Sequence, residues 1–250
     1  MIRLSVNVNK VATLRNARGG DNPSVRRAAE VAIAAGCHGI TVHPRPDERH
    51  IRRADVLELA SWLPVELNVE GYPGKEWLAL VEKVRPAQAT LVPDPPEVLT
   101  SNAGWKFGEA DRLWLVDVVS RLRAKGCRVS LFVDPSPREV EGAKSVGADR
   151  VELYTEPYAR AFHGPRRDAA FARYRNAAER AAKLGLGVNA GHDLDLDNLP
   201  YFAQNLPGLA EVSIGHALIS DALFRGLEAT VRAYLAALGG PVPPTEEVMP

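Results

Sequence analysis

Short β-branched runs alternate with longer amphipathic segments along almost the whole chain. Such runs are typical of parallel strands that are buried on both faces. We expect eight strands, at residues 2–7, 39–43, 65–70, 88–92, 128–133, 150–154, 186–189 and 210–214. The helical period between them predicts eight helices, at residues 23–36, 53–62, 74–84, 109–125, 136–146, 166–184, 195–205 and 217–238. Glycine recurs just before several strands, where the C-cap of a helix belongs.

Eight strand–helix units in 250 residues predict an α/β fold, and specifically a TIM (β/α)8 barrel. A doubly wound open sheet is the alternative, but it usually has fewer strands and a glycine-rich fingerprint after the first one. The stretch that follows the first strand, VNVNKVATLRNARGG, lacks the GxGxxG pattern. We therefore expect one barrel domain over residues 1–238, with residues 239–250 as a disordered tail.

Composition excludes several classes of protein. The 31 Lys and Arg residues balance 31 Asp and Glu residues, and no basic tail suggests a nucleic-acid surface. No apolar stretch approaches the 18 residues of a membrane span, and the N-terminus does not resemble a signal peptide. Cys37 and Cys127 have no CxxC partner. We interpret them as free thiols of a cytoplasmic protein.

Polar residues collect at the C-terminal ends of the expected strands, which is where barrel enzymes build their active sites. At these ends and in the loops after them lie Asn7, Asn9, Lys10, His43, Arg45, His50, Glu70, Thr100, Asp134, Glu152, Asn189, Gly191, His192, Asp193, Gly215 and His216. Four of the six histidines are among them, whereas the helix faces show no such clustering. This distribution predicts an enzyme.

Individual residues leave alternatives open. His43 ends a core strand and could be a hydrogen-bonded core histidine. Glu70 closes a buried strand, and a carboxylate there is costly unless it is paired or functional. Glu152 could pair with an arginine. Asp134 is expected to cap the next helix.

Four further features bear on ligands and access. The NAGHD and SIGHA turns put glycine before a helix, which suits phosphate. Arg15 and Arg18 could hold a second anion together with Arg45, or belong to a solvated loop. Neither HxH nor HExxH occurs, so we expect no metal. The long connections at 93–108 and 155–166 are expected to be functional loops.

Several long stretches resemble the pyridoxine 5′-phosphate synthase family of the deoxyxylulose-dependent vitamin B6 pathway. They are VNVNKVATLRNARGG (6–20), GITVHPRPDERHI (39–51), LNVEG (67–71), LVP (91–93), RVSLFVD (128–134), VELYT (151–155), GLGVNAGHDL (185–194) and EVSIGHALI (211–219). They span nearly the whole chain in order. The resemblance implies a TIM barrel with extra helices, which condenses 3-amino-2-oxopropyl phosphate with 1-deoxy-D-xylulose 5-phosphate. The products are pyridoxine 5′-phosphate, phosphate and water.

The resemblance also implies roles for residues. His43 and Glu70 would accept protons, and His192 would donate one. The amino-ketone phosphate would be held by Asn7, Arg18, Asp193, Gly215 and His216. The sugar phosphate would be held by Arg45, His50 and Thr100. Asn9, Lys10, Glu152 and Gly191 are further candidate site residues. It implies no cofactor, phosphorylated small molecules as the only partners besides other copies of the chain, and a homo-octamer with a mobile loop after the fourth strand.

The chain departs from the family pattern in three places. Asn9 and Lys10 stand where many members have Asp-His, Asp193 stands where Gly is frequent, and Tyr154 replaces a frequent His. Because His43, Glu70 and His192 are present, we expect an active synthase with a variant substrate subsite. The alternatives are another phosphate-handling TIM-barrel lyase or isomerase, and a non-catalytic barrel that binds a B6 vitamer.

Overall fold

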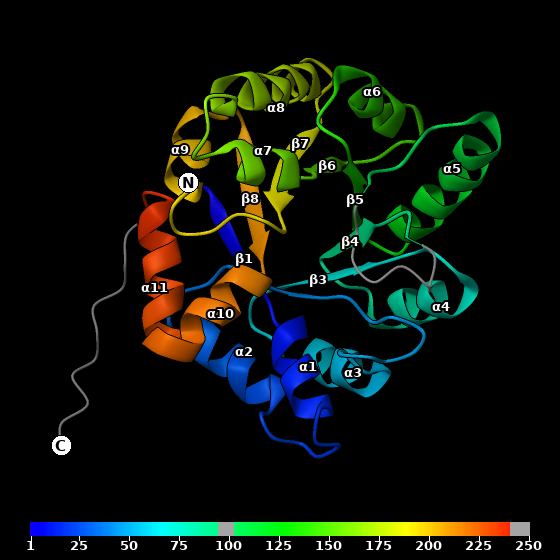
Figure 1. The fold of residues 1–250 in the computed structure, drawn as a ribbon. Helices are drawn as coiled ribbons and strands as arrows, with labels where there is room; N and C mark the ends of the chain where they lie inside the picture. The colour runs from blue at the N-terminus through cyan, green and yellow to red at the C-terminus, as the bar shows by residue number, and fades with distance from the viewer. Residues whose placement is uncertain (95–102, 241–250) are drawn as a thin grey trace.

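The computed structural model describes residues 1–94 and 103–240, and within them eight parallel strands close into a barrel (Figure 1). The strands are β1 (Arg3–Asn7), β2 (Gly39–Val42), β3 (Glu66–Gly71), β4 (Gln88–Leu91), β5 (Arg128–Val133), β6 (Arg150–Leu153), β7 (Gly187–Gly191) and β8 (Leu209–Ile214). Each strand pairs in parallel with the next, and β8 pairs with β1. The TIM barrel predicted from the sequence is confirmed.

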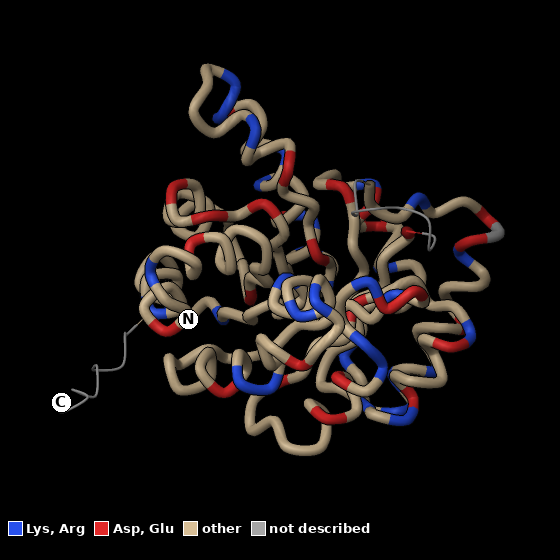
Figure 2. Tube along the Cα trace, turned by 60° about the horizontal axis from the view of Figure 1, so that its bottom comes forward, with Lys and Arg blue, Asp and Glu red and all other residues tan. Residues whose placement is uncertain are grey.

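Helices surround the barrel on its outside (Figure 1). They are α1 (Asn9–Asn16), α2 (Val25–Ala34), α3 (Arg53–Trp62), α4 (Lys75–Val84), α5 (Glu109–Ala124), α6 (Pro137–Ser145), α7 (Glu156–Ala161), α8 (Arg167–Lys183), α9 (Leu199–Asn205), α10 (His216–Arg225) and α11 (Leu227–Ala237). None of the described helices is long and apolar enough to cross a membrane. Lys and Arg are interspersed with Asp and Glu over the view in Figure 2.

Three details of the helices differ from the sequence prediction. Helix α1 was not expected, and the loop expected at 155–166 contains α7. The single helix expected at 217–238 is divided in two at Gly226, whose φ of 81° cannot continue a right-handed helix. The extra helices predicted for this barrel are therefore present.

The barrel interior is polar, whereas branched apolar side chains dominate most barrels of this type. Ser5 and Thr41 share a hydrogen bond of 2.6 Å between their hydroxyls, and Thr90 donates to Asn68 at 3.0 Å. Asn189 is directed across the barrel, with its amide nitrogen 3.4 Å from the Gln88 oxygen on β4. The strands also carry a chain of ion pairs, in which Glu66 links Arg128 to Arg3 and Glu211 links Arg3 to Arg150.

The apolar core lies between the strands and the helices. Leu4, Val6, Ile40 and Val42 alternate with the inward polar residues of β1 and β2 and are fully buried. Because polar contacts fill the interior, this outer layer provides most of the hydrophobic stabilisation.

His38, Cys37 and Cys127 lie away from the cavity, and the two cysteines follow the sequence prediction. His38 lies at the opposite end of the barrel, where its Nδ1 accepts a hydrogen bond of 3.1 Å from the Leu4 amide. Cys37 and Cys127 are buried free thiols. Burial raises the pKa of Cys37 to about 12, so its thiol is inert at neutral pH.

Asp134 does not cap helix α6, contrary to the sequence prediction. The cap is Ser136, whose Oγ accepts a hydrogen bond from the Glu139 amide at 3.3 Å. Asp134 instead accepts from the Gly104 amide at 3.0 Å and binds the Lys106 ammonium. Its carboxylate therefore anchors the segment that precedes α5. Of the expected tail, residues 241–250 lie outside the described part of the chain, as does Thr100.

Gly71, at the end of β3, provides a test of the packing. A Cβ at this position would collide with the indole of Trp77, which is 7% exposed and donates its Nε1 proton to the Glu70 carbonyl at 2.9 Å. We expect Gly71→Ala to lower the free energy of unfolding by about 1–3 kcal/mol. Urea titration measures this loss. Gly20→Ala is the control, because nothing lies within 4 Å of a Cβ there; an equal loss in both variants would contradict the packing argument.

Candidate active site

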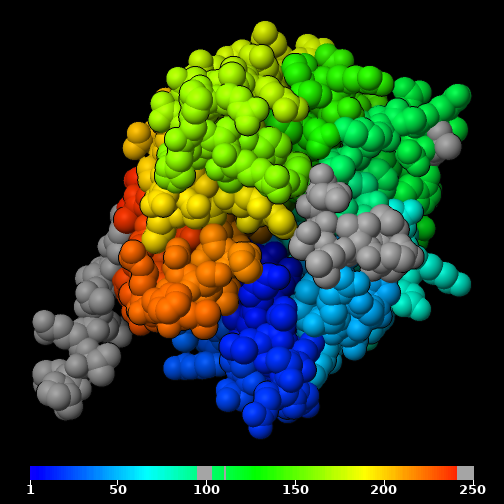
Figure 3. Space-filling model, in the orientation of Figure 1, coloured from blue at the N-terminus to red at the C-terminus, as the bar shows by residue number. Residues whose placement is uncertain are grey.

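A cavity of about 370 Å³ opens at the C-terminal end of the barrel, a size that suits a small-molecule site. In Figure 3 it lies at the centre of the face, between the blue N-terminal segment, the orange α10 and the yellow segment that follows β7. Among the predicted residues, its walls contain Asn7, Asn9, Lys10, His43, Arg45, His50, Glu70, Glu152, His192, Gly215 and His216. Sequence analysis missed Thr13, Arg49, Thr90, Val92, Phe132 and Ser213.

Three of the described residues to which the family resemblance gives a candidate site role do not line this cavity. Arg18 is exposed beyond the end of α1. Gly191 and Asp193 are the chain neighbours of His192. Thr100 falls outside the described residues. The hypothesis that Arg15 contacts an anion is wrong, because Arg15 is 4% exposed and its guanidinium is ion-paired with Asp55.

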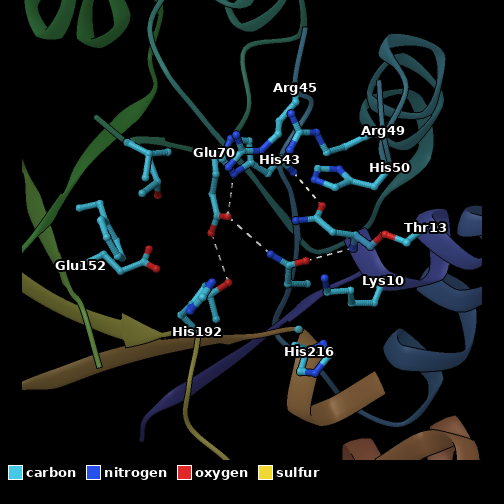
Figure 4. A pocket seen from close by; sticks show the side chains of 17 residues that line it. Lys10, Thr13, His43, Arg45, Arg49, His50, Glu70, Glu152, His192 and His216 are labelled. Atoms are coloured by element: carbon cyan, nitrogen blue, oxygen red, sulfur yellow. Dashed lines mark hydrogen bonds and ion pairs between the residues drawn. The ribbon is translucent and has the colours of Figure 1, made fainter. Parts of the chain in front are cut away.

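Glu70 lies at the centre of the cavity wall and faces His43 (Figure 4). Its Oε2 is 3.9 Å from His43 Nδ1 and 3.5 Å from the Asn7 amide nitrogen, and its Oε1 is 3.5 Å from Ser213 Oγ. Burial raises the pKa of Glu70 to about 8, against the opposing effect of the Ser213 hydroxyl, and the nearby Glu211 raises it further. Glu70 is therefore mainly protonated at neutral pH but titrates within reach of it.

His43 and His50 are both held neutral. Burial lowers the pKa of His43 well below its usual value, and the positive charge of Arg45 adds to this effect. Burial likewise lowers the pKa of His50 to about 4. The positive charges of Arg45 and Lys10 add smaller downward shifts. The Nδ1 of His50 accepts a hydrogen bond from the Ile51 amide at 2.9 Å, which assigns the ring proton to Nε2. His43 can thus accept a proton, and His50 can donate a hydrogen bond without carrying charge.

His192 behaves in the opposite way. Its hydrogen bond with Asp193, at 3.0 Å between Nδ1 and Oδ2, raises the pKa of the imidazole despite burial. The backbone of His192 is left-handed, with φ of 61°, and its amide donates to the Ser213 carbonyl at 3.2 Å. Gly191 permits this turn, because a Cβ there would collide with the same carbonyl. His192 is therefore suited to donate a proton.

Glu152 is a second buried acid in the cavity. It is 5% exposed, and its Oε2 has no hydrogen-bond partner among the described residues. Burial raises its pKa well above the usual value, and the proximity of Glu70 adds to the shift. The alternative that Glu152 pairs with an arginine is therefore wrong: Arg150 pairs with Glu211, at 3.7 Å.

Cationic side chains and main-chain amide donors also line the cavity. Lys10, Arg45 and Arg49 contribute cationic side chains to its wall, and Arg45 lies 3.5 Å from Asp94. Gly215 is the N-cap of α10, so the first amides of that helix face the same opening. An anionic group is favoured there. Within residues 1–94 and 103–240, no cluster of three His, Cys, Asp or Glu residues is placed to hold a metal ion.

Sequence comparison assigns the chain to a family. The model of the family described as pyridoxal phosphate biosynthesis protein PdxJ matches residues 4–240. The chain belongs to this family. A pyridoxine 5′-phosphate synthase of Cytophaga hutchinsonii is 55% identical over 238 residues, which cover 95% of this chain and 99% of that protein. One of Bacteroides thetaiotaomicron is 57% identical over 235 residues, covering 94% and 98% of the two chains.

Solved structures with low sequence identity share the fold. N-(5′-phosphoribosyl)anthranilate isomerase from Pyrococcus furiosus superposes with a TM-score of 0.61 at 13% identity, covering 96% of this chain and 99% of that one. Thiamine phosphate pyrophosphorylase from the same organism gives a TM-score of 0.61 at 12% identity, with 95% of each chain covered. These likenesses extend to the barrel architecture alone.

The raised pKa of Glu70 predicts a pH-dependent effect on stability. Between pH 4.5 and about 8 the folded chain keeps a proton on Glu70 that the unfolded chain has lost, so ionisation favours unfolding as the pH rises. We expect Glu70→Gln, which cannot ionise, to gain stability relative to the wild type across this window. His43, His50, Glu152 and Glu211 remain in both proteins, so the difference between the two reports mainly on Glu70. Urea unfolding from pH 5 to 8 measures it, and a constant difference would contradict the assignment.

Proposed function

We propose that this chain is a pyridoxine 5′-phosphate synthase, which condenses 3-amino-2-oxopropyl phosphate with 1-deoxy-D-xylulose 5-phosphate. The observation that carries the proposal is the convergence on one cavity of a histidine with a lowered pKa, a carboxylic acid with a raised pKa and a histidine with a raised pKa. These shifts at His43, Glu70 and His192 have separate physical causes: burial at His43 and at Glu70, and the Asp193 hydrogen bond at His192. Relatives with more than half of their residues identical, matched along nearly their entire length, support the same activity.

The reaction needs several proton transfers at neutral pH. Imine formation, dehydration, enolisation and ring closure each move a proton, and groups that titrate near neutrality catalyse such steps best. We assign proton acceptance to His43 and Glu70 and proton donation to His192. Glu70 is largely protonated at neutral pH. It can therefore accept a proton only in steps that begin with its side chain in the carboxylate form. The overall conversion changes no redox state, so the proposal includes neither an organic cofactor nor a metal.

The two phosphorylated substrates call for two anion subsites. We assign the amino-ketone phosphate to Asn7, Gly215 and His216 around the N-terminus of α10, with Arg18 and Asp193 included from the family resemblance. The carboxylate of Asp193 is engaged by His192 and acts by holding the charge on that ring. We assign the sugar phosphate to Arg45, His50 and Thr100. Lys10 joins them because it lines the same cavity as a flexible cation.

The proposal extends to assembly, compartment and domain organisation. Leu14 on α1 and Leu223 and Phe224 on α10 are exposed apolar side chains, at 54%, 69% and 91%, on two helices that contact each other. Covering these side chains favours a homo-oligomer, which the family resemblance specifies as an octamer. Buried free thiols suit the reducing cytoplasm. We retain the single domain over residues 1–238 and the tail over 239–250 as proposals.

A different phosphate-handling lyase or isomerase is the second candidate, and Asn9-Lys10 is the feature that favours it. The Asn9 side-chain oxygen accepts a hydrogen bond from the His43 amide at 2.9 Å, so Asn9 supports the main chain at His43. That leaves Lys10 as the group that departs most from the family pattern at the substrate. A non-catalytic barrel that binds a B6 vitamer would have no use for three tuned proton-transfer groups.

A turnover assay on the purified chain tests the proposal. Freshly generated 3-amino-2-oxopropyl phosphate is mixed with deoxyxylulose phosphate, and pyridoxine 5′-phosphate is followed by fluorescence, with His43→Ala as control. Product from the wild type and none from the control is the expected result. A folded wild type that binds inorganic phosphate without forming product would favour the lyase or isomerase. Binding of pyridoxine 5′-phosphate without turnover would favour the vitamer-binding barrel.

Glu70→Gln tests the proton-transfer assignment. The amide keeps the size of the side chain but cannot exchange a proton, so we expect the rate to fall at least about tenfold while the fold is retained. Steady-state kinetics and circular dichroism measure the two effects. Turnover at the wild-type rate would remove Glu70 from the mechanism.

Lys10→Met tests the variant subsite. Loss of the ammonium group should raise KM for the sugar phosphate about tenfold, because one charge-assisted contact to phosphate is lost. KM for the amino-ketone should change little. Lys125→Met, at the exposed C-terminus of α5, is the matched control. Equal KM values in the wild type and Lys10→Met would show that Lys10 does not contact the substrate.

A further inference from the structure

A buried ion pair beneath the His50 loop lies outside the cavity wall, and the mechanism does not use it. Arg15 on α1 binds Asp55 on α3 through two parallel hydrogen bonds, of 2.6 Å from Nη1 to Oδ1 and 2.9 Å from Nη2 to Oδ2. The two residues are 4% and 8% exposed. A bidentate pair of this kind is rigid, because the planar guanidinium matches the carboxylate in both position and orientation.

The pair also holds the chain that carries His50. Arg15 Nη2 donates a further hydrogen bond of 3.0 Å to the main-chain carbonyl of His50, and the neighbouring Asn16 amide donates to the same carbonyl at 2.8 Å. Asp55 completes the arrangement by accepting from the Arg52 amide at 2.7 Å. The main chain is therefore fixed on both sides of Ile51, whose amide donates to the His50 ring.

Asn16 also fixes the main chain of the preceding turn. Its amide donates to the Glu48 carbonyl at 3.1 Å, and Glu48 has a left-handed backbone with φ of 50°. The Glu48 side chain in turn accepts from the Arg53 amide at 2.7 Å. A non-glycine residue in this conformation persists when its surroundings determine it. Arg15 and Asn16 together thus specify the path of the loop that runs from the site back to α3.

We infer that Arg15 is a positioning residue, whose buried ion pair with Asp55 fixes the main chain at His50 and so presents the Nε2–H of this imidazole to the cavity. The consequence for substrate follows from the proposed function, in which His50 contacts the sugar phosphate. Arg15 itself contacts no substrate. It makes the loop rigid enough for His50 to act as an uncharged hydrogen-bond donor at a defined place.

Arg15→Lys tests this inference, because lysine keeps the positive charge but cannot bind Asp55 and the His50 carbonyl simultaneously through a planar fork. Arg121→Lys is the matched control, since Arg121 forms an exposed ion pair with Glu82, 2.8 Å away between α5 and α4. Both variants are made in the full chain. Asn16→Ala is a second variant. It removes the amide donors to Glu48 and His50 and the acceptor of the Arg15 Nε proton, while both groups of the ion pair remain.

The first readout is nuclear magnetic resonance of ring nitrogens in the chain labelled with ¹⁵N-histidine, with His50 assigned by His50→Gln. In the wild type we expect a single neutral Nε2–H tautomer and a His50 pKa of about 4. In Arg15→Lys we expect averaging of the two tautomers and a pKa shifted toward the ordinary 6.5. The second readout is kinetic: KM for the sugar phosphate should rise about tenfold, with KM for the amino-ketone and kcat within about twofold of the wild type.

Unchanged His50 resonances and unchanged KM in Arg15→Lys would overturn the inference, as would equal effects in Arg121→Lys. If Arg15→Lys fails to fold, Asn16→Ala decides by the same two readouts. If the wild type forms no product, the proposed function fails by itself, and the ring-nitrogen resonances still decide whether Arg15 positions His50.

Discussion

Burial of Glu70 inside a closed barrel is the constraint on which the chemistry of the site depends. A carboxylate removed from water is disfavoured unless a charge partner compensates it, and the nearest groups to Glu70 are uncharged or acidic. The same loss of solvent raises the pKa of Glu152 and lowers the pKa of His43. His192 differs because its hydrogen bond with Asp193 raises the pKa of the imidazole despite burial. The pKa values of two histidines are thus shifted in opposite directions within one cavity.

The barrel makes this arrangement possible because eight parallel strands end on one face. Six of the strands contribute a side chain to the cavity wall, and His43 and His192 directly follow the other two, β2 and β7. Residues far apart in sequence therefore meet at one end of the barrel. The polar interior below them is satisfied by hydrogen bonds between strands, and the helices supply the apolar burial on the outside. The Arg15–Asp55 pair adds rigidity where a loop, rather than a strand, must place a side chain.

Most of the fold and much of the cavity could be predicted from the sequence. The eight strands follow from apolar runs whose length and β-branching leave few alternatives, and every strand end was a candidate for the site. Helix α1 was missed because its eight residues, NKVATLRN, carry few apolar side chains and follow a strand almost directly. The break at Gly226 was missed because a glycine inside a helical period does not reveal its dihedral angles.

The errors at individual side chains concern partners that lie far apart in the chain. Arg15 was a candidate anion ligand in the sequence, but in the structure it binds Asp55, 40 residues away. Asp134 looked like a helix cap, but it binds the segment at Gly104. Glu152 could have paired with an arginine, but its Oε2 has no hydrogen-bond partner within the described residues. Local patterns predict which residues reach a strand end, whereas long-range pairing decides which of them remain available to a ligand.

Direct titration of Glu70 is the most incisive measurement. Carboxyl ¹³C resonances of the chain labelled with ¹³C-glutamate, with Glu70 identified by its absence from Glu70→Gln, report its protonation at each pH. We predict a midpoint near pH 8, because burial and the neighbouring Glu211 oppose ionisation. A midpoint near the ordinary value of 4.5 would mean that Glu70 is a fixed anion at neutral pH. That result would contradict the view that desolvation inside the barrel sets the chemistry of this site.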